Sequence, residues 1–209
     1  MNIGICGGTF DPFHRGHLDP VLAVREELQW DRVLYIPAYV QPFKTDRVTA
    51  PGPHRFAMAV LATEGHDALY VSPQELERGA ISYTVDTLQQ LRGDYPDARL
   101  DWIIGDDNLE KLHEWRSIET IIQLANFVVL TRQRRTGFSP SILHERVGLK
   151  PALRPEPNGT IVFAENTTVP ISSTEIRLRI REGQPIEHLV GERVSRYIHH
   201  YELYRKGQS

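Results

Sequence analysis

Residues 2–17 have the sequence NIGICGGTFDPFHRGH, which joins a short apolar strand, a glycine turn and the beginning of a helix. We predict the strand over residues 2–6, and the helical spacing of apolar side chains continues to Leu28. Strand, turn and helix in this order open a βαβ unit, whose two strands are parallel. This stretch therefore predicts a parallel sheet covered by helices.

The alternation of strand and helix continues to the end of the chain. Further strands are expected at residues 32–36, 68–72, 100–104, 126–131 and 160–164. Helices are expected at residues 54–63 and 85–91, on both sides of Trp115, between Ser172 and Gly183, and at residues 195–204. The fold class that follows is α/β, a Rossmann-like doubly wound parallel sheet.

The length of the chain suits one domain of this class. The chain has 209 residues, and we expect a single domain over residues 1–209 with a C-terminal helical portion from about residue 172. Residues 136–158 contain four prolines and little periodicity, which favours an irregular insert there.

The charge balance argues against a nucleic-acid partner. Lys and Arg total 24 against 27 Asp and Glu, a net charge of −3, whereas duplex binding draws on a basic surface. Cys6 is the only cysteine, which excludes an intrachain disulfide and a cysteine-based zinc cluster. Residues 1–5 lack the features of a signal peptide, and no apolar run approaches the ~20 residues that span a bilayer. We therefore expect a cytoplasmic protein with no membrane segment.

The carboxyl ends of parallel strands meet at one edge of the sheet, where ligands bind in folds of this class. That edge is predicted to carry Gly7 and Gly8 and residues 37–44, 105–107 and 132–135. The two glycines allow the backbone to approach a polyphosphate closely, and the following helix offers its N-terminal amides and dipole. Because Thr9 adds a hydroxyl donor, the first loop predicts a cradle for a phosphorylated ligand.

His14 and His17 stand at the beginning of the first predicted helix. They are three residues apart, so both imidazole rings can face one side of the turn. A helix cap, a half-buried pair and a two-ligand metal site are the alternatives, and the metal site lacks an obvious third ligand. We favour a contact with phosphate, because the pair follows the glycine loop.

Residues 171–177, with the sequence ISSTEIR, form a second candidate anion site. Ser172 with Glu175 three residues later is a capping-box pattern. Hydroxyl groups at a helix N-terminus, with Arg177 one turn later, suit a bound anion. An ordinary capped helix with a surface arginine is the alternative.

These two blocks resemble the HxGH and ISSTxIR motifs of the nucleotidyltransferase superfamily, whose members join a nucleotide α-phosphate to an incoming phosphate. The resemblance implies catalytic roles for His14, His17 and Arg177. It further implies that ATP is bound by Gly7, Gly8, Thr9, Phe10, His14, His17, Gly105, Asp107, Arg132, Ile171, Ser172, Ser173, Thr174 and Arg177. Arg132 is included because it stands nearest to the end of the preceding strand.

Three blocks between these motifs resemble the bacterial nicotinate mononucleotide adenylyltransferase family, in the same order and with similar spacing. They are ISYTVDTL at 81–88, IIGDD at 103–107 and LHEW at 112–115. In that family they form the pyridine nucleotide pocket, which implies Thr84, Asp107 and Trp115 here; an indole can stack on a pyridinium ring. Nicotinate mononucleotide would then be bound by Gly8, Thr9, Lys44, Thr84 and Trp115.

Two positions depart from the family pattern. The family usually has proline-proline-histidine-lysine where this chain has QPFK at 41–44, so Lys44 is kept and Phe43 replaces the histidine. Asp106 stands where alanine is common, which adds a charge beside Asp107. Neither departure touches the two phosphate motifs.

The resemblance implies adenylyl transfer from ATP to nicotinate mononucleotide, which forms nicotinate adenine dinucleotide and pyrophosphate in NAD biosynthesis. The attacking phosphate monoester has a second pKa of about 6 and is mostly a dianion at neutral pH, so it needs no general base. The protein must instead cancel charge and align the reactants. Mg²⁺ is expected as a cofactor held mainly by the ATP phosphates, because the chain offers no dedicated carboxylate cage.

Other functions fit part of these motifs. Phosphopantetheine adenylyltransferase and, less closely, a cytidylyltransferase share the phosphate motifs, and nicotinamide mononucleotide is an alternative substrate. A non-catalytic nucleotide sensor would use the cradle only to bind. The sequence does not distinguish a monomer from a homo-oligomer.

Overall fold

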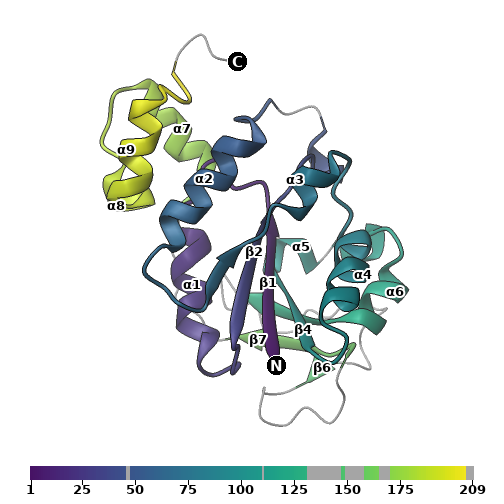
Figure 1. Ribbon diagram of the computed structural model, residues 1–209. Coiled ribbons are helices and arrows are strands. Elements are labelled where there is room, and N and C mark those ends of the chain that lie inside the picture. Colours follow the sequence, from purple (N-terminus) through teal and green to yellow (C-terminus); the bar gives the residue numbers. More distant parts are fainter. Residues whose placement is uncertain (46–47, 110, 131–146, 149–157, 165–169, 206–209) are drawn as a thin grey trace.

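The computed structural model describes residues 1–45, 48–109, 111–130, 147–148, 158–164 and 170–205 (Figure 1). Among these residues, seven parallel strands form one sheet in the order β3-β2-β1-β4-β5-β7-β6. The strands are β1 Asn2–Gly8, β2 Arg32–Pro37, β3 Leu69–Val71, β4 Arg99–Gly105, β5 Asn126–Leu130, β6 Val147–Gly148 and β7 Ile161–Ala164. The predicted α/β class with a doubly wound parallel sheet is confirmed.

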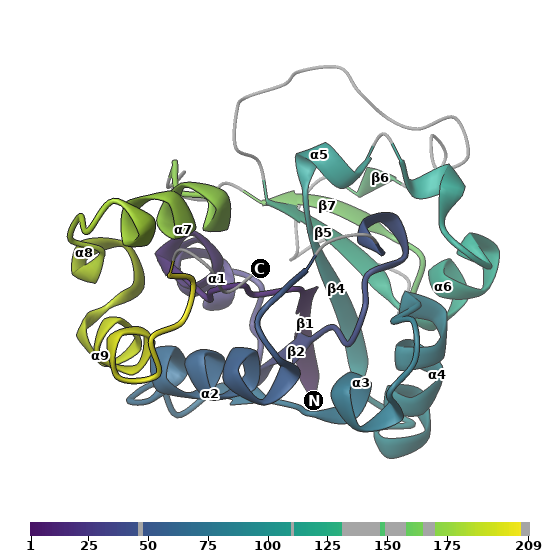
Figure 2. The same ribbon diagram turned by 90° about the horizontal axis from the view of Figure 1, so that it is seen from above.

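Helices cover both faces of the sheet, with α4 and α6 on one side and α1 and α2 on the other (Figure 2). The described α-helices are α1 Arg15–Arg25, α2 Gly52–Thr63, α3 Gln74–Arg78, α4 Thr84–Asp94, α5 Asp106–Leu109, α6 Ile118–Leu124, α7 Ser173–Arg181, α8 Glu187–Val190 and α9 Glu192–His200. Two 3-10 helices, η1 Pro42–Lys44 and η2 Leu112–Glu114, lie in the connections. Across the described ranges, we find no helix with the length and apolar character that crossing a bilayer requires.

The strands separate two apolar cores, because successive side chains of a strand point to opposite faces. Leu34 packs with Leu88 of α4 on one face, and its neighbour Val33 packs with Val24 of α1 on the other. All four side chains are buried. Burial on both faces explains why these strands are nearly continuous apolar runs in the sequence.

The C-terminal helices α7, α8 and α9 form a third apolar cluster against α2. Ile176, Val194 and Ile198 are buried there together with Met58 of α2. Figure 1 shows these helices beside α1 and α2, at the end of the molecule away from α4 and α6. This packing places residues near the end of the chain next to the first loop.

Several elements differ from the sequence prediction. The short helices α3 and α8 were not predicted, because one turn is too short to show a periodicity. The last helix is Glu192–His200 rather than 195–204, and the backbone beyond it has positive φ at Glu202 and Tyr204. Most of the predicted insert at 136–158 lies outside the described residues, but β6 within it pairs with β7, so the insert is not wholly irregular.

The order of the strands reverses between β1 and β4. From β1 the chain adds β2 and β3 on one side, and from β4 it adds β5 and β7 on the other. Loops that leave two such neighbouring strands diverge toward opposite faces and open a crevice at their carboxyl ends. Gly8 ends β1 and Gly105 ends β4, so the topology alone places the two glycines and the loop after β1 at this crevice.

Candidate active site

Gly7 and Gly8 are the last two residues of β1, so the predicted strand over residues 2–6 with a glycine turn after it is wrong. Packing within the protein requires a glycine at both positions. A Cβ added at Gly7 would lie 2.8 Å from the indole of Trp102, and one at Gly8 would lie 2.9 Å from the ring of Phe10. Phe10 has a φ of 51°, and its buried ring packs against Tyr35. The predicted contact between Phe10 and ATP is therefore open only to its backbone.

Thr9, between that glycine pair and Phe10, carries a buried hydroxyl with no hydrogen-bond partner among the described residues. Its backbone carbonyl accepts a hydrogen bond from the buried guanidinium of Arg55 at 2.8 Å. Arg55 also donates to the carbonyl of Ala38, after β2, at 2.7 Å. Since buried hydroxyls normally have partners, Thr9 Oγ1 is available to a ligand bound at this loop.

The two histidines of the first loop form a stacked pair at the N-terminus of α1. The ring centroids of His14 and His17 are 3.7 Å apart and the rings are inclined by 23°. His17 Nδ1 accepts a hydrogen bond from the backbone amide of His14 at 3.3 Å, which assigns the proton of a neutral His17 ring to Nε2. His17 is only partly buried, and in this tautomer its Nε2–H is a hydrogen-bond donor.

Gly16 explains the spacing of the histidine motif. A Cβ at this position would lie 3.0 Å from two ring atoms of His14 and 3.5 Å from the carbonyl oxygen of Ile171. The absent side chain therefore makes room for the His14 ring and for the segment that enters α7. The two predicted anion sites, 155 residues apart between Gly16 and Ile171 in the sequence, are neighbours in space.

The N-terminus of α7 lies against the first loop. Ser172 caps the helix, since its hydroxyl accepts a hydrogen bond from the amide of Glu175 at 3.2 Å. The reciprocal half of the predicted capping box is wrong, because the Glu175 carboxylate is paired with Arg179 at 3.0 Å. Ser173 donates to the carbonyl of Pro12 at 3.2 Å. The N-terminal ends of α1 and α7, where the helix dipoles are positive, therefore both lie beside this loop.

Arg177 is held by the first loop through Asp11. Its guanidinium donates to the Asp11 carbonyl at 2.6 Å and lies 3.6 Å from the Asp11 carboxylate. The same carboxylate accepts hydrogen bonds from the Tyr204 hydroxyl at 2.8 Å and from the Ala50 amide at 3.0 Å. Asp11 is 4% exposed. This buried acceptor joins the first loop, the loop before α2, α7 and the end of the chain.

Neighbouring groups define the charge state of this network. Burial lowers the pKa of Arg55, and the nearby Asp11 carboxylate opposes that shift. Burial, followed by the Asp11 charge and hydrogen bond, raises the pKa of Tyr204 well above its usual range. The Tyr204 phenol therefore stays protonated and donates to Asp11 throughout the physiological pH range.

Thr84 and Trp115, two of the predicted mononucleotide residues, lie on the α4 side of the sheet. Thr84 is the first residue of α4 and is partly exposed. Trp115 follows η2, is half-buried, and meets Phe127 edge-on at a centroid distance of 6.1 Å. Gly105 ends β4 beside the first loop. The Trp115 indole therefore has a packing role and still retains accessible surface.

Three predicted site residues have side chains outside the described part of the structure. The backbone places Lys44 at the end of η1 and Asp107 in α5. Arg132 lies wholly outside the described residues.

Sequence reasoning missed Asp11, Arg55 and Tyr204. Asp11 was visible inside the histidine motif, where a carboxylate between apolar residues is a signal of a buried partner. Arg55 and Tyr204 gave no local signal, because the hydrogen bonds that join them to the first loop span 46 and 193 residues of the chain.

A metal cage and a cysteine nucleophile find no support in the described residues. Within those ranges no group of three or more His, Cys, Asp or Glu side chains is placed to hold a metal ion. Cys6 packs against the core on the α1 side of the sheet. Burial raises the pKa of its thiol to about 12, which leaves it in the unreactive thiol form.

We expect the folded protein to resist alkylation at Cys6. Iodoacetamide at pH 8 should modify Cys6 slowly in the folded protein and rapidly in urea, because only the unfolded thiol has an ordinary pKa. The extent of modification is measured by mass spectrometry. Equal rates in the two conditions would contradict the raised pKa of the Cys6 thiol.

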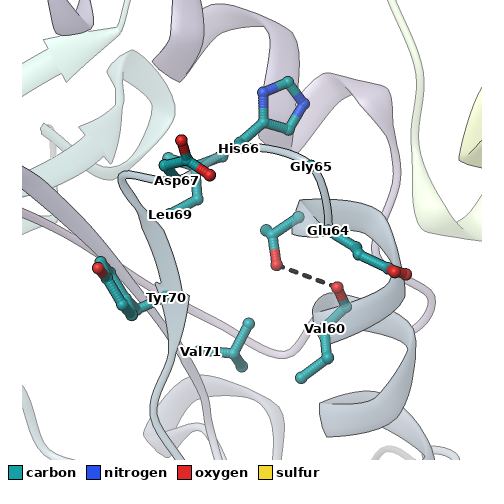
Figure 3. Close-up of a pocket in the computed structure, with 9 residues that line it drawn as sticks. Val60, Glu64, Gly65, His66, Asp67, Leu69, Tyr70 and Val71 are labelled. Carbon is teal, nitrogen blue, oxygen red and sulfur yellow. Dashed lines mark hydrogen bonds between the residues drawn. The ribbon is translucent and has the colours of Figure 1, made fainter.

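A separate cavity of about 310 Å³ lies between the C-terminal end of α2 and β3 (Figure 3). It is lined by Val60, Thr63, Glu64, Gly65, His66, Asp67, Leu69, Tyr70 and Val71. None of these residues belongs to the motifs above.

A doubly wound parallel sheet, with paired histidines and two helix N-termini beside the loop of its first strand, defines a nucleotidyltransferase. The family model described as cytidylyltransferase-like matches residues 5–179. A probable nicotinate-nucleotide adenylyltransferase from Thermoanaerobacter sp. (strain X514) is 35% identical over 212 residues, covering 100% of this chain and 96% of the relative. One from Clavibacter michiganensis subsp. michiganensis is 36% identical over 208 residues, with the same coverage. The chain belongs to the nicotinate-nucleotide adenylyltransferase family.

The fold agrees with solved structures. Nicotinic acid mononucleotide adenylyltransferase from Plasmodium falciparum, complexed with NaAD, matches with a TM-score of 0.70 at 18% identity, covering 97% of each chain. The same enzyme complexed with APC matches with a TM-score of 0.69 at 17% identity, covering 97% of this chain and 96% of that one. At such identities the likeness establishes the fold.

Proposed function

We propose that this protein transfers the adenylyl group of ATP to nicotinate mononucleotide, forming nicotinate adenine dinucleotide and pyrophosphate in NAD biosynthesis. One observation carries the proposal: the stacked pair His14 and His17 and the N-termini of α1 and α7 lie together beside the loop after β1. This arrangement gathers hydrogen-bond donors and helix dipoles at one place, as a triphosphate requires. The family to which the chain belongs supports the choice of substrates.

The reaction is an in-line displacement at the α-phosphorus of ATP. An oxygen of the mononucleotide 5′-phosphate forms a bond to the α-phosphorus, and the bond from that phosphorus to the bridging oxygen breaks to release pyrophosphate. Since the nucleophile is already a dianion, with a second pKa of about 6, no residue has to remove a proton. Catalysis rests on alignment and on donors aimed at the developing charge.

The catalytic roles that we propose follow from the positions of three side chains. His17 donates from Nε2 to the α-phosphate region, and the buried His14 ring stacks beneath it and fixes its orientation. Arg177 is oriented by Asp11 and offers its remaining N–H groups to the leaving pyrophosphate. Ser173 and Thr174 lie at the start of α7, and we propose that they hold the β- and γ-phosphates together with Arg177.

The binding residues are proposed in two groups. The ATP group adds Gly7, Gly8, Thr9, the Phe10 backbone, Gly105, Asp107, Arg132, Ile171 and Ser172 to the three catalytic residues and to Ser173 and Thr174. The mononucleotide group consists of Gly8, Thr9, Lys44, Thr84 and Trp115. The free hydroxyl of Thr9 supports its place in both groups.

We propose Mg²⁺ as the divalent ion that accompanies ATP. Mg²⁺ binds through few protein ligands and retains water and phosphate oxygens, and the described residues contain no cage that would hold it without the nucleotide. When bound it would neutralise triphosphate charge. We further propose that residues 1–209 form a single nucleotidyltransferase domain, without a nucleic-acid partner.

The assay that tests this function is pyrophosphate release. Purified protein with ATP and Mg²⁺ should release pyrophosphate with nicotinate mononucleotide, and less with nicotinamide mononucleotide. Release with phosphopantetheine instead, or with CTP in place of ATP, would assign the site to another transferase. Nucleotide binding without release under every condition would identify a sensor.

Replacing Trp115 with alanine tests the mononucleotide side. Loss of stacking should weaken mononucleotide binding by about 1–3 kcal/mol, a rise in KM of about 5- to 150-fold, with the KM for ATP unchanged. Trp115→Phe keeps an aromatic face and should recover part of the loss. An unchanged KM for the mononucleotide in Trp115→Ala would refute the stacking role.

A further inference from the structure

Glu75 is a buried carboxylate that the reaction does not use. It lies in α3, between β3 and α4, and is 4% exposed. Its Oε1 accepts a hydrogen bond from the Thr87 hydroxyl of α4 at 2.6 Å, and the Ser82 hydroxyl also hydrogen-bonds to the carboxylate. Burial raises the pKa of Glu75, while these two hydrogen bonds and the charge of Arg78 oppose the shift.

Ser82 connects Glu75 to the loop after β2. Its hydroxyl accepts a hydrogen bond from the Tyr39 amide at 3.0 Å, and its own amide donates to the Val40 carbonyl at 2.9 Å. Val40 and Ile81 also form a parallel bridge. Because the Ser82 oxygen accepts from Tyr39, its proton is left to donate to Glu75. The Ser82 hydroxyl therefore links the Glu75 carboxylate to the backbone amide of Tyr39.

The two elements that meet at Glu75 both lead to the mononucleotide side of the site. The loop after β2, which contains Tyr39, runs into η1, and η1 ends with Lys44. Helix α4 begins at Thr84, one turn before Thr87. The residues proposed for the ATP phosphates come from the loop after β1 and from α7, which are other elements. Glu75 thus connects the loop after β2 with the N-terminal turn of α4, and both belong to the proposed mononucleotide side of the site.

We propose that Glu75 is a positioning residue for nicotinate mononucleotide, holding the loop after β2 and the N-terminus of α4 in the arrangement that this substrate requires. The proposal rests on the proposed function for the identity of the substrate. A carboxylate suits this place because it accepts hydrogen bonds from both hydroxyls at once. Burying a charge is costly, and a role in positioning gives a reason for keeping it in α3.

The test is the variant Glu75→Gln, with Glu77→Gln on the same helix as the matched control because Glu77 is exposed. A glutamine keeps the shape but removes the charge and replaces one acceptor oxygen with an NH2 donor, so the two hydroxyl donors no longer face two acceptor oxygens. Steady-state pyrophosphate release should show a KM for nicotinate mononucleotide raised about tenfold, equivalent to about 1.4 kcal/mol, with the KM for ATP within about twofold. The control should match the parent in both constants.

Hydrogen exchange supplies a readout that does not depend on turnover. In Glu75→Gln, and in Ser82→Ala, the Tyr39 amide should exchange faster than in the parent, whereas Ser82→Thr should keep its protection. Ser82→Ala and Ser82→Thr carry the same kinetic test if Glu75→Gln does not fold. If the parent shows no activity with the mononucleotide, the proposed function fails, and the exchange at Tyr39 still decides whether Glu75 positions the loop. An unchanged mononucleotide KM, an equal rise in both KM values, or unchanged Tyr39 exchange would each overturn the proposal.

Discussion

Replacing His17 with alanine is expected to lower kcat by about 100- to 1,000-fold, the usual effect of removing one donor aimed at transition-state charge. The variant loses the Nε2–H donor of His17. The hydrogen bond from the His14 amide to Nδ1 places the proton of the neutral ring on Nε2. The ATP affinity should change much less, because the amides of α1 and the other phosphate contacts remain. Steady-state kinetics with ATP and nicotinate mononucleotide measures both quantities.

His66→Ala is the matched control for this experiment. His66 is exposed and lines the cavity between α2 and β3, apart from the motifs of the site (Figure 3). It should retain the kcat of the parent. A kcat for His17→Ala within a few-fold of the control would show that the ring does not stabilise the transition state.

Replacing Asp11 with alanine is expected to destabilise the protein by about 3 kcal/mol, the lower end of the range for breaking a buried ion pair. We expect the lower end of that range because the Arg177 side chain is 20% exposed, so the pair is only partly shielded from water. The Tyr204 hydroxyl and the Ala50 amide would also lose their acceptor. For a chain of this length, the loss corresponds to a decrease in Tm of about 6–12 °C. Thermal and urea unfolding measure it.

Two further variants isolate the role of Asp11 in stability. Asp94→Ala, at an exposed position near the end of α4, should change the stability by less than about 0.5 kcal/mol. Tyr204→Phe removes one hydrogen bond to Asp11 and should cost about 1 kcal/mol. An Asp11→Ala variant as stable as Asp94→Ala would mean that the C-terminal helices are held by apolar packing alone.

The strands at the centre of the sheet were predictable because they are buried on both faces. The runs before Gly7 and after Leu100 are apolar almost without interruption, and each ends at a glycine where β1 and β4 end. The two motifs predicted to bind phosphate were equally visible, since each pattern consists of neighbours three or four residues apart. Elements of one turn, such as α3, carry no such periodic signal, which is why Glu75 went unnoticed.

Some predicted residues have a second, structural reason for their identity. Gly7 and Gly8 were attributed to the approach of a polyphosphate, yet the rings of Trp102 and Phe10 exclude any side chain there. Phe10 was assigned to ATP and has a buried ring. A sequence motif does not distinguish residues kept for a ligand from residues kept for packing. Only the packed structure shows which positions are fixed by their neighbours.

The sequence by itself determined the class of the fold and the positions of the two motifs that we predict to bind phosphate, because each depends on short-range periodicity or on adjacent residues. Only the tertiary structure decided how the two motifs meet at Gly16 and Ile171, and which groups orient them. Asp11 is joined to Tyr204 across 193 residues. Contacts of that kind form where separate elements pack, so no local pattern in the sequence can carry them.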